Sequence, residues 1–109
     1  MNLNDLTIGQ AKELVNMLSS NGGDDPWQVG KVYLIRTETM IDTGRLVKVT
    51  PQELVLEDAA WIADTGRFAN TLKSLDFNEV EPFPDGQVII GRRSIIDAVV
   101  ISDVQRVQK

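Results

Sequence analysis

The chain contains no cysteine and no histidine among its 109 residues. The lack of cysteine excludes disulfides and thiolate metal sites, and the lack of histidine removes the commonest general base and transition-metal ligand. No apolar run approaches the ~20 residues of a membrane helix, and the N-terminus lacks the pattern of a signal peptide. We therefore expect a cytoplasmic, non-enzymatic protein with no metal, no cofactor and no membrane partner.

Basic residues are also scarce. The chain has 11 Lys and Arg against 16 Asp and Glu, which gives a net charge of −5. Proteins that hold nucleic acid through its phosphates usually present a basic face, so any such face here must be local. The length suits a single domain over residues 1–109, and 42% hydrophobic residues are enough for a modest core.

The chain is organised around residues 44–62. Two short apolar runs, 46–49 and 54–56, flank Pro51, which fixes φ and suits the first corner of a tight turn. This pattern predicts a β-hairpin. The preceding residues, 31–41, have apolar and mixed residues on both faces and predict one long bent strand, with residues 42–44 as the turn into the hairpin.

An amphipathic helix is predicted over residues 7–19. Thr7 and Gln10 have the spacing of a capping box, and Gly22 and Gly23 suit the end of the helix. One apolar stripe at helical spacing follows the cap, and the opposite side is polar. The stripe consists of Ile8, Ala11, Leu14, Val15 and Leu18.

Residues 63–86 are predicted to be an insertion between two halves of one sheet, too short for a second domain. Residues 67–75 suit a short helix with Phe68, Leu72 and Leu75 on one face. The acidic connection that follows contains two prolines and ends in a turn signal at 84–86.

The last third returns to strands, at residues 87–90 and 95–101. The second run is almost continuously apolar, which suggests burial on both faces, with either the N-terminal helix or a neighbouring subunit as the cover. The polar tail, 102–109, is expected to fray.

Two segments resemble the signatures of the Sm-like (LSm) family. Residues 44–47 and 54–59, with the sequence LVLEDA in the second, are similar to the first signature. Residues 88–95 resemble the second, an apolar triplet followed by an Arg-Gly pair and an isoleucine-rich strand. The resemblance covers about half the chain. It implies a mainly β fold with an N-terminal helix: a small, strongly bent, antiparallel five-stranded barrel (Sm-like or SH3-like), over about 30–62 and 87–102, with a helical insertion.

The resemblance also implies an RNA pocket, from which this chain departs. Glu53 stands where the family has a base-contacting asparagine, and the Arg-Gly order is reversed at Gly91-Arg92. The corresponding RNA-binding residues would be Glu53, Gly91, Arg92 and Arg93. A carboxylate at position 53 would face phosphate-rich RNA unfavourably.

Two functions remain open at this point. The first is a non-catalytic, ring-forming scaffold or interaction module, a homo-oligomer of about five to seven copies by resemblance to the family. Its interface would use the two edge strands through Val88, Ile89, Ile90, Ile95, Val99 and Ile101. The alternative is an RNA-binding ring of the RNA-chaperone type, in which Arg92 and Arg93 repeat around a basic rim.

An enzyme is the weakest reading. Paired carboxylates could be sought at Asp58 and Asp64, or at Glu79 and Glu81. Their spacing favours an exposed acidic loop, and no nucleophile motif or phosphate-binding glycine loop accompanies them.

Overall fold

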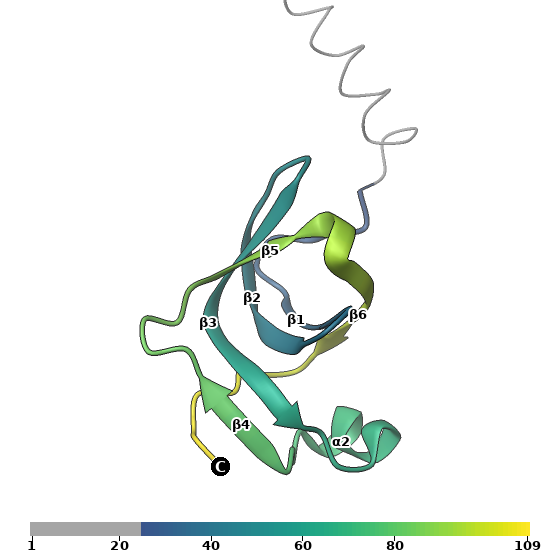
Figure 1. The fold of residues 1–109 in the computed structure, drawn as a ribbon, viewed down its shortest axis with the longest axis vertical. Coiled ribbons are helices and arrows are strands. Elements are labelled where there is room, and N and C mark those ends of the chain that lie inside the picture. The colour runs from purple at the N-terminus through teal and green to yellow at the C-terminus, as the bar shows by residue number, and fades with distance from the viewer. Residues whose placement is uncertain (1–24) are drawn as a thin grey trace, which may run out of the picture.

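The computed structural model describes residues 25–109, which form one antiparallel sheet of six strands and a short helix (Figure 1). The helix predicted over residues 7–19 lies outside this part of the chain. The strands are β1 (Val32–Thr37), β2 (Ile41–Val49), β3 (Glu53–Asp64), β4 (Glu79–Pro82), β5 (Val88–Gly91) and β6 (Ile95–Ile101). The helix α2 (Phe68–Ser74) joins β3 to β4, and the 3₁₀ turn η2 (Arg92–Ser94) joins β5 to β6.

The predicted hairpin over residues 44–62 is confirmed and is formed by β2 and β3. Thr50 closes its turn, because its N–H donates to the Glu53 carbonyl at 2.9 Å and its hydroxyl accepts from the Glu53 N–H at 3.0 Å. Pro51 supplies the corner between them.

β3 is the central strand, since it pairs with three others. Its first half pairs with β5, placing Glu53 opposite Gly91, and its second half pairs with β4, placing Trp61 opposite Glu81. Asp58 separates the halves with a φ of 51°. Such a left-handed residue is uncommon outside glycine and redirects a strand, so one continuous element serves two parts of the sheet.

The prediction of one strand over residues 31–41, with a turn at 42–44, is wrong. β1 ends at Thr37, whose N–H donates to the Met40 carbonyl at 2.8 Å and whose hydroxyl accepts from the Met40 N–H at 3.0 Å. This local side-chain bond closes a turn four residues earlier than expected. Residues 42–44 consequently lie inside β2.

Gly44 lies where β2 crosses β3 most closely. A Cβ at this position would lie 3.0 Å from Ala59 Cβ, from Leu56 Cβ and from the Glu57 carbonyl oxygen. The register between the two strands also shifts beside it, from Thr43 to Arg45. Glycine is needed here because any side chain would force the strands apart.

The expectation of a closed five-stranded barrel is not met. The sheet has six strands in the order β4-β3-β2-β1-β6, with β5 on the first half of β3, and it does not close. Physically, η2 connects β5 to β6 around a corner, so the two strands follow each other without pairing (Figure 1). The added strand is β4, from the segment predicted as an insertion.

Alternate residues of β1 serve two apolar clusters. Tyr33 and Ile35 lie in the first, with Leu46, Leu54, Leu56, Ala59 and Ile90. Leu34 lies in the second, with Ala60, Ile62, Phe77, Val80 and Ile101. The short helix predicted over residues 67–75 is confirmed as α2, and Phe68, Leu72 and Leu75 pack on the second cluster. The segment 63–86 therefore covers the second face of the sheet.

The tail, expected to fray, instead packs on the sheet. The Arg106 guanidinium donates to the Ala59 carbonyl at 2.6 Å and to the Phe83 carbonyl at 3.0 Å. The backbone of Lys109 exchanges two hydrogen bonds with Val80 of β4, at 3.1 and 3.3 Å. These bonds tie the tail to β3, to β4 and to the connection after β4. Within residues 25–109 no helix has the length and apolarity needed to cross a bilayer.

Candidate assembly interface

Three strands of the curled sheet, β4, β5 and β6, have a single strand partner each. β4 pairs with β3 and is also bonded to the tail through Lys109. The other two are β5, which pairs with β3, and β6, which pairs with β1. The outer edge of each leaves backbone N–H and C=O groups without a strand partner in the described part of the chain. Such edges are templates for pairing with another chain.

Exposed apolar side chains accompany both edges. Ile89 of β5 is 57% exposed; on β6, Ile96 is 65%, Val99 39% and Val100 51% exposed. Exposed aliphatic groups gathered on one surface mark interaction sites more often than scattered single residues do. The exposed apolar residues at these edges are therefore Ile89, Val99 and two β6 residues, Ile96 and Val100, that the sequence did not mark out.

The other four residues predicted for the interface face inward. Ile90 is 5% exposed in the first cluster, and Ile101 is 6% exposed in the second. Val88 and Ile95 are half-buried against the first cluster. Their side chains stabilise the protomer itself.

A register shift explains the exposure of Ile96. Asp97 lies opposite Arg36 and Ile95 lies opposite Thr37, which leaves Ile96 between them without a partner residue on β1. Bulged residues of this kind are redirected from the regular alternation. The exposure of Ile96 could not be predicted from the apolar run alone. It depends on the irregular pairing of β6 with β1, a strand some 60 residues away in the chain.

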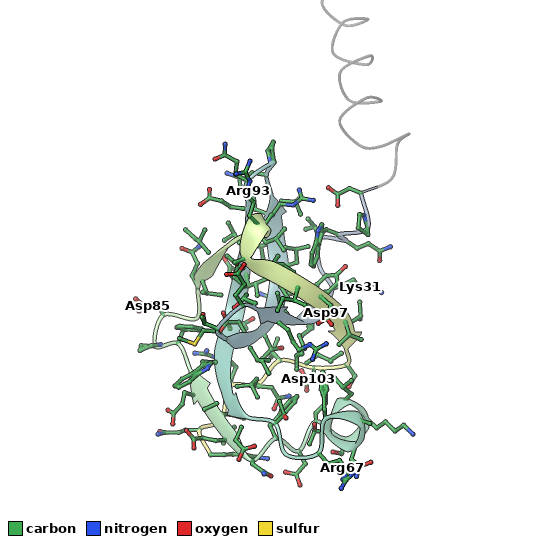
Figure 2. The ribbon with its side chains drawn as sticks, turned by 45° about the vertical axis from the view of Figure 1, so that its right-hand side comes forward. Lys31, Arg67, Asp85, Arg93, Asp97 and Asp103 are labelled. Carbon is green, nitrogen blue, oxygen red and sulfur yellow. The ribbon has the colours of Figure 1, made fainter. Side chains whose placement is uncertain are left out.

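The only charge within β6 is neutralised by β1. The Asp97 carboxylate forms an ion pair with Arg36, whose guanidinium also lies 5.0 Å from the centre of the Phe68 ring in α2. The hydrogen bond from Arg36 lowers the pKa of Asp97. Asp97, labelled in Figure 2, therefore does little to repel another chain from β6.

The residues predicted to contact RNA lie together at the β2–β3 turn. Glu53 is opposite Gly91, and η2 follows at once, so Arg92 and Arg93 lie beside the turn. Figure 2 labels Arg93. A hollow of about 440 Å³ at the turn is lined by Pro51, Gln52, Gly91, Arg92 and Arg93.

The two arginines differ in their surroundings. Arg92 makes contacts within the protein: its guanidinium donates to the Thr50 carbonyl at 3.0 Å and lies 3.6 Å from the Asp25 carboxylate. Arg93 is exposed. Of the pair, Arg93 is therefore the arginine available to a ligand.

The candidate catalytic carboxylates serve structural contacts. Asp58 pairs with Arg45, and the Asp64 carboxylate accepts the Gly66 N–H at 2.9 Å. Glu79 lies opposite Asp64 across β3 and β4, whereas Glu81 is the acceptor for the Gln108 amide. Across residues 25–109, no three His, Cys, Asp or Glu side chains gather in a way that could hold a metal ion.

Asp42 is the one buried carboxyl group in the described chain. It lies in β2 between Ile35 of β1 and Trp61 of β3, and it is 8% exposed. Burial raises the pKa of Asp42 to about 6, because the charged form loses its hydration. This buried carboxyl was not predicted, because the turn expected at 42–44 would have left Asp42 in solvent.

Comparison with family models, with curated proteins and with solved structures finds no match to this chain. The features of the described chain that bear on function are the strand edges, the exposed apolar groups and the arginines at the β2–β3 turn.

Proposed function

We propose that the chain is a non-catalytic interaction module that assembles head-to-tail with copies of itself into a closed ring. The observation that supports this is the pair of strand edges on two different strands, β5, which pairs with β3, and β6, which pairs with β1. An edge that pairs with a different edge of the next copy generates a ring when the rotation closes. The Sm-like resemblance supports about five to seven copies, and we place the ring in the cytoplasm.

The energetics favour a closed ring over an isolated pair. Four partly exposed side chains, Ile89, Ile96, Val99 and Val100, are available for burial. At roughly 1 kcal/mol each for their exposed parts they contribute about 4 kcal/mol per contact. Association costs at least about 4 kcal/mol, so one contact is marginal even with backbone hydrogen bonds added. In a ring every copy makes two contacts, and closure makes the last one intramolecular.

Sedimentation velocity on three variants tests the assembly. Ile89→Lys places a charge on the β5 edge, and Val99→Lys places one on the β6 edge. Val107→Lys is the matched control, because Val107 is 76% exposed on the tail, which packs beside β4. We expect closed oligomers for the wild type and for Val107→Lys, and monomers for the two edge variants. A monomeric wild type would refute the proposal, as would edge variants that assemble normally.

Mixing the edge variants tests the head-to-tail geometry. Ile89→Lys keeps an intact β6 edge and Val99→Lys keeps an intact β5 edge, so an equal mixture can form one good contact. We expect a one-to-one heterodimer at high protomer concentration and no larger species. Dimers of either variant alone would instead indicate that like edges pair, which excludes a head-to-tail ring.

The second candidate function is an RNA-binding ring of the RNA-chaperone type. Exposed Arg93 beside the hollow at the β2–β3 turn favours it, because a ring would repeat this cation in every copy. Glu53 at the same turn and the net charge of −5 oppose it. We expect weak retention of oligo-U or oligo-A at physiological salt. Salt-sensitive binding that Arg93→Ala abolishes, and the exposed control Arg67→Ala does not, would favour the RNA reading.

A further inference from the structure

An apolar groove runs between the start of the described chain and β6. Its walls are Pro26, Trp27 and Tyr33 on one side and Ile96, Ala98 and Val100 of β6 on the other. Its volume is about 460 Å³. Both Ile96 and Val100 are more than half exposed, so the groove is open to solvent within the described part of the chain. Its lining is mostly apolar, and the one charged residue in it, Asp97, is paired with Arg36.

The walls of the groove are rigidly held. The Trp27 ring meets the Tyr33 ring edge-on, with 5.1 Å between their centres, and the Tyr33 hydroxyl accepts the Gln28 N–H at 2.9 Å. Asp25 accepts the Trp27 N–H at 3.0 Å and lies 3.6 Å from Arg92 of η2. The chain therefore enters the described region at a fixed point on the rim of the groove.

We propose that the groove is the docking site for the N-terminal segment of the same chain. The occupant is the apolar stripe of the helix predicted over residues 7–19, with Leu14 and Val15 at its centre. Ile96 and Val100 line this groove and were also assigned to the assembly interface, so a docked segment would leave Val99 and the backbone edge of β6 for ring formation. The docked segment would cover Ile96 and Val100, the exposed side chains of the groove wall.

Length supports this occupant. In a helix, Ile8 and Leu18 are about 15 Å apart along the axis. Along β6, residues 95–100 extend over about 17 Å, so stripe and groove match. Seven residues, 19–25, separate Leu18 from Pro26. An extended connection of this length reaches roughly 25 Å, enough for the helix to turn back onto the groove.

Attachment favours the chain's own segment over a separate partner. The stripe is joined to the rim through Asp25, so its effective concentration at the groove reaches the millimolar range for a short linker. The stripe offers aliphatic side chains, and the walls of the groove offer aliphatic and aromatic ones. No charge on the helix has to be buried, because its polar side faces away from the stripe.

Disulfide trapping tests the proposal directly, since the natural chain contains no cysteine. Val100→Cys is paired in turn with Ala11→Cys, Leu14→Cys and Leu18→Cys on the stripe. The control partners are Lys12→Cys and Asn16→Cys on the polar side. If the stripe docks, at least one stripe pair closes within the chain about tenfold faster than both control pairs.

The outcomes separate the occupants. Closure within one chain, seen as a faster band on a denaturing gel, supports docking of the chain's own segment. Links only between chains would overturn the proposal in favour of a neighbouring copy, and equal rates on both faces of the helix would overturn docking altogether. Ring assembly is read separately, by sedimentation of the reduced proteins, because Val100 belongs to the groove and to the assembly interface. Closure within the chain in a protein that does not form the ring still supports docking.

Tryptophan fluorescence provides a second readout that needs no cross-link. In a Trp61→Phe background, the remaining tryptophan is Trp27 in the wall of the groove. We expect Leu14→Asp to shift the Trp27 emission to longer wavelength, whereas Lys12→Asp leaves it unchanged. Identical spectra for the two variants would overturn the proposal, because a docked stripe must shield Trp27 from water.

Discussion

The buried carboxyl of Asp42 should make the stability of this protein fall as the pH rises. Its pKa in the folded state is about 6, against an ordinary value of 3.8 for an aspartate. A carboxyl whose pKa is raised by folding contributes its full stability below the unfolded pKa and loses it as the pH rises through the folded pKa. The loss therefore occurs between about pH 4 and pH 6, with little further change above pH 7.

The size of the effect follows from the shift. Two pKa units correspond to about 3 kcal/mol, at 1.36 kcal/mol per unit. Asp42→Asn removes the titration and keeps the shape of the side chain. We therefore expect the variant to gain about 3 kcal/mol relative to wild type on going from pH 4 to pH 7. The pKa values of Asp76 and Asp97 are lowered by Lys109 and Arg36, so these two groups add stability as the pH rises. Their contribution is the same in wild type and in Asp42→Asn and cancels in the difference.

Urea unfolding at pH 4, 5, 6 and 7, at one fixed protomer concentration, measures this difference. Asp85→Asn is the matched control, because it removes one carboxylate from the exposed turn after Pro84. Its difference from wild type at each pH is the baseline against which the difference for Asp42→Asn is measured. A pH-independent gap between Asp42→Asn and wild type would refute the reasoning and would show that Asp42 is hydrated in solution.

Two further predictions concern stability. Gly44→Ala should cost about 1–3 kcal/mol, because its Cβ would lie 3.0 Å from the Glu57 carbonyl oxygen and from two Cβ atoms; an unchanged urea midpoint would contradict the close crossing. Arg106→Ala should cost about 1–3 kcal/mol by removing its bonds to the Ala59 and Phe83 carbonyls, whereas exposed Arg67→Ala should cost less than about 0.5 kcal/mol. Equal melting temperatures for the two arginine variants would show that the tail is not held.

The elements that sequence reading located were those with local signals. Pro51 between two apolar runs marked the β2–β3 hairpin, and the spacing of Phe68, Leu72 and Leu75 marked α2. The two final strands were found by their apolar runs. In each case the sequence within about ten residues contains the physical cause, either a fixed φ or an apolar face of the right period.

The elements that it missed depend on contacts between distant residues. The turn after Thr37 interrupts a run of residues that favours a strand, and it is closed by the bond from the Met40 N–H to the Thr37 hydroxyl. Gly44 was expected in a turn but lies within β2, where Ala59 of β3 comes too close to leave room for a side chain. The packing of the tail was not predicted because the tail has no apolar pattern. It is held instead by hydrogen bonds from Arg106 and Lys109 to backbone groups of β3 and β4. The apolar residues of β6 were found, but which of them face outward depends on its register with β1.

That register has a consequence during synthesis. Arg36 and Asp97, which pair across β1 and β6, are 61 residues apart in the chain. A ribosome adds residues at about 5–20 per second, so β1 waits roughly 3–12 s for its second neighbour. The β1–β2–β3 meander can form in that interval, because its contacts are local. Until β6 arrives, the nascent chain exposes a strand edge beside Leu34 and Ile35, both fully buried later. Growing chains on one messenger would then be most prone to aggregate in the span between completion of β3 and translation of β6.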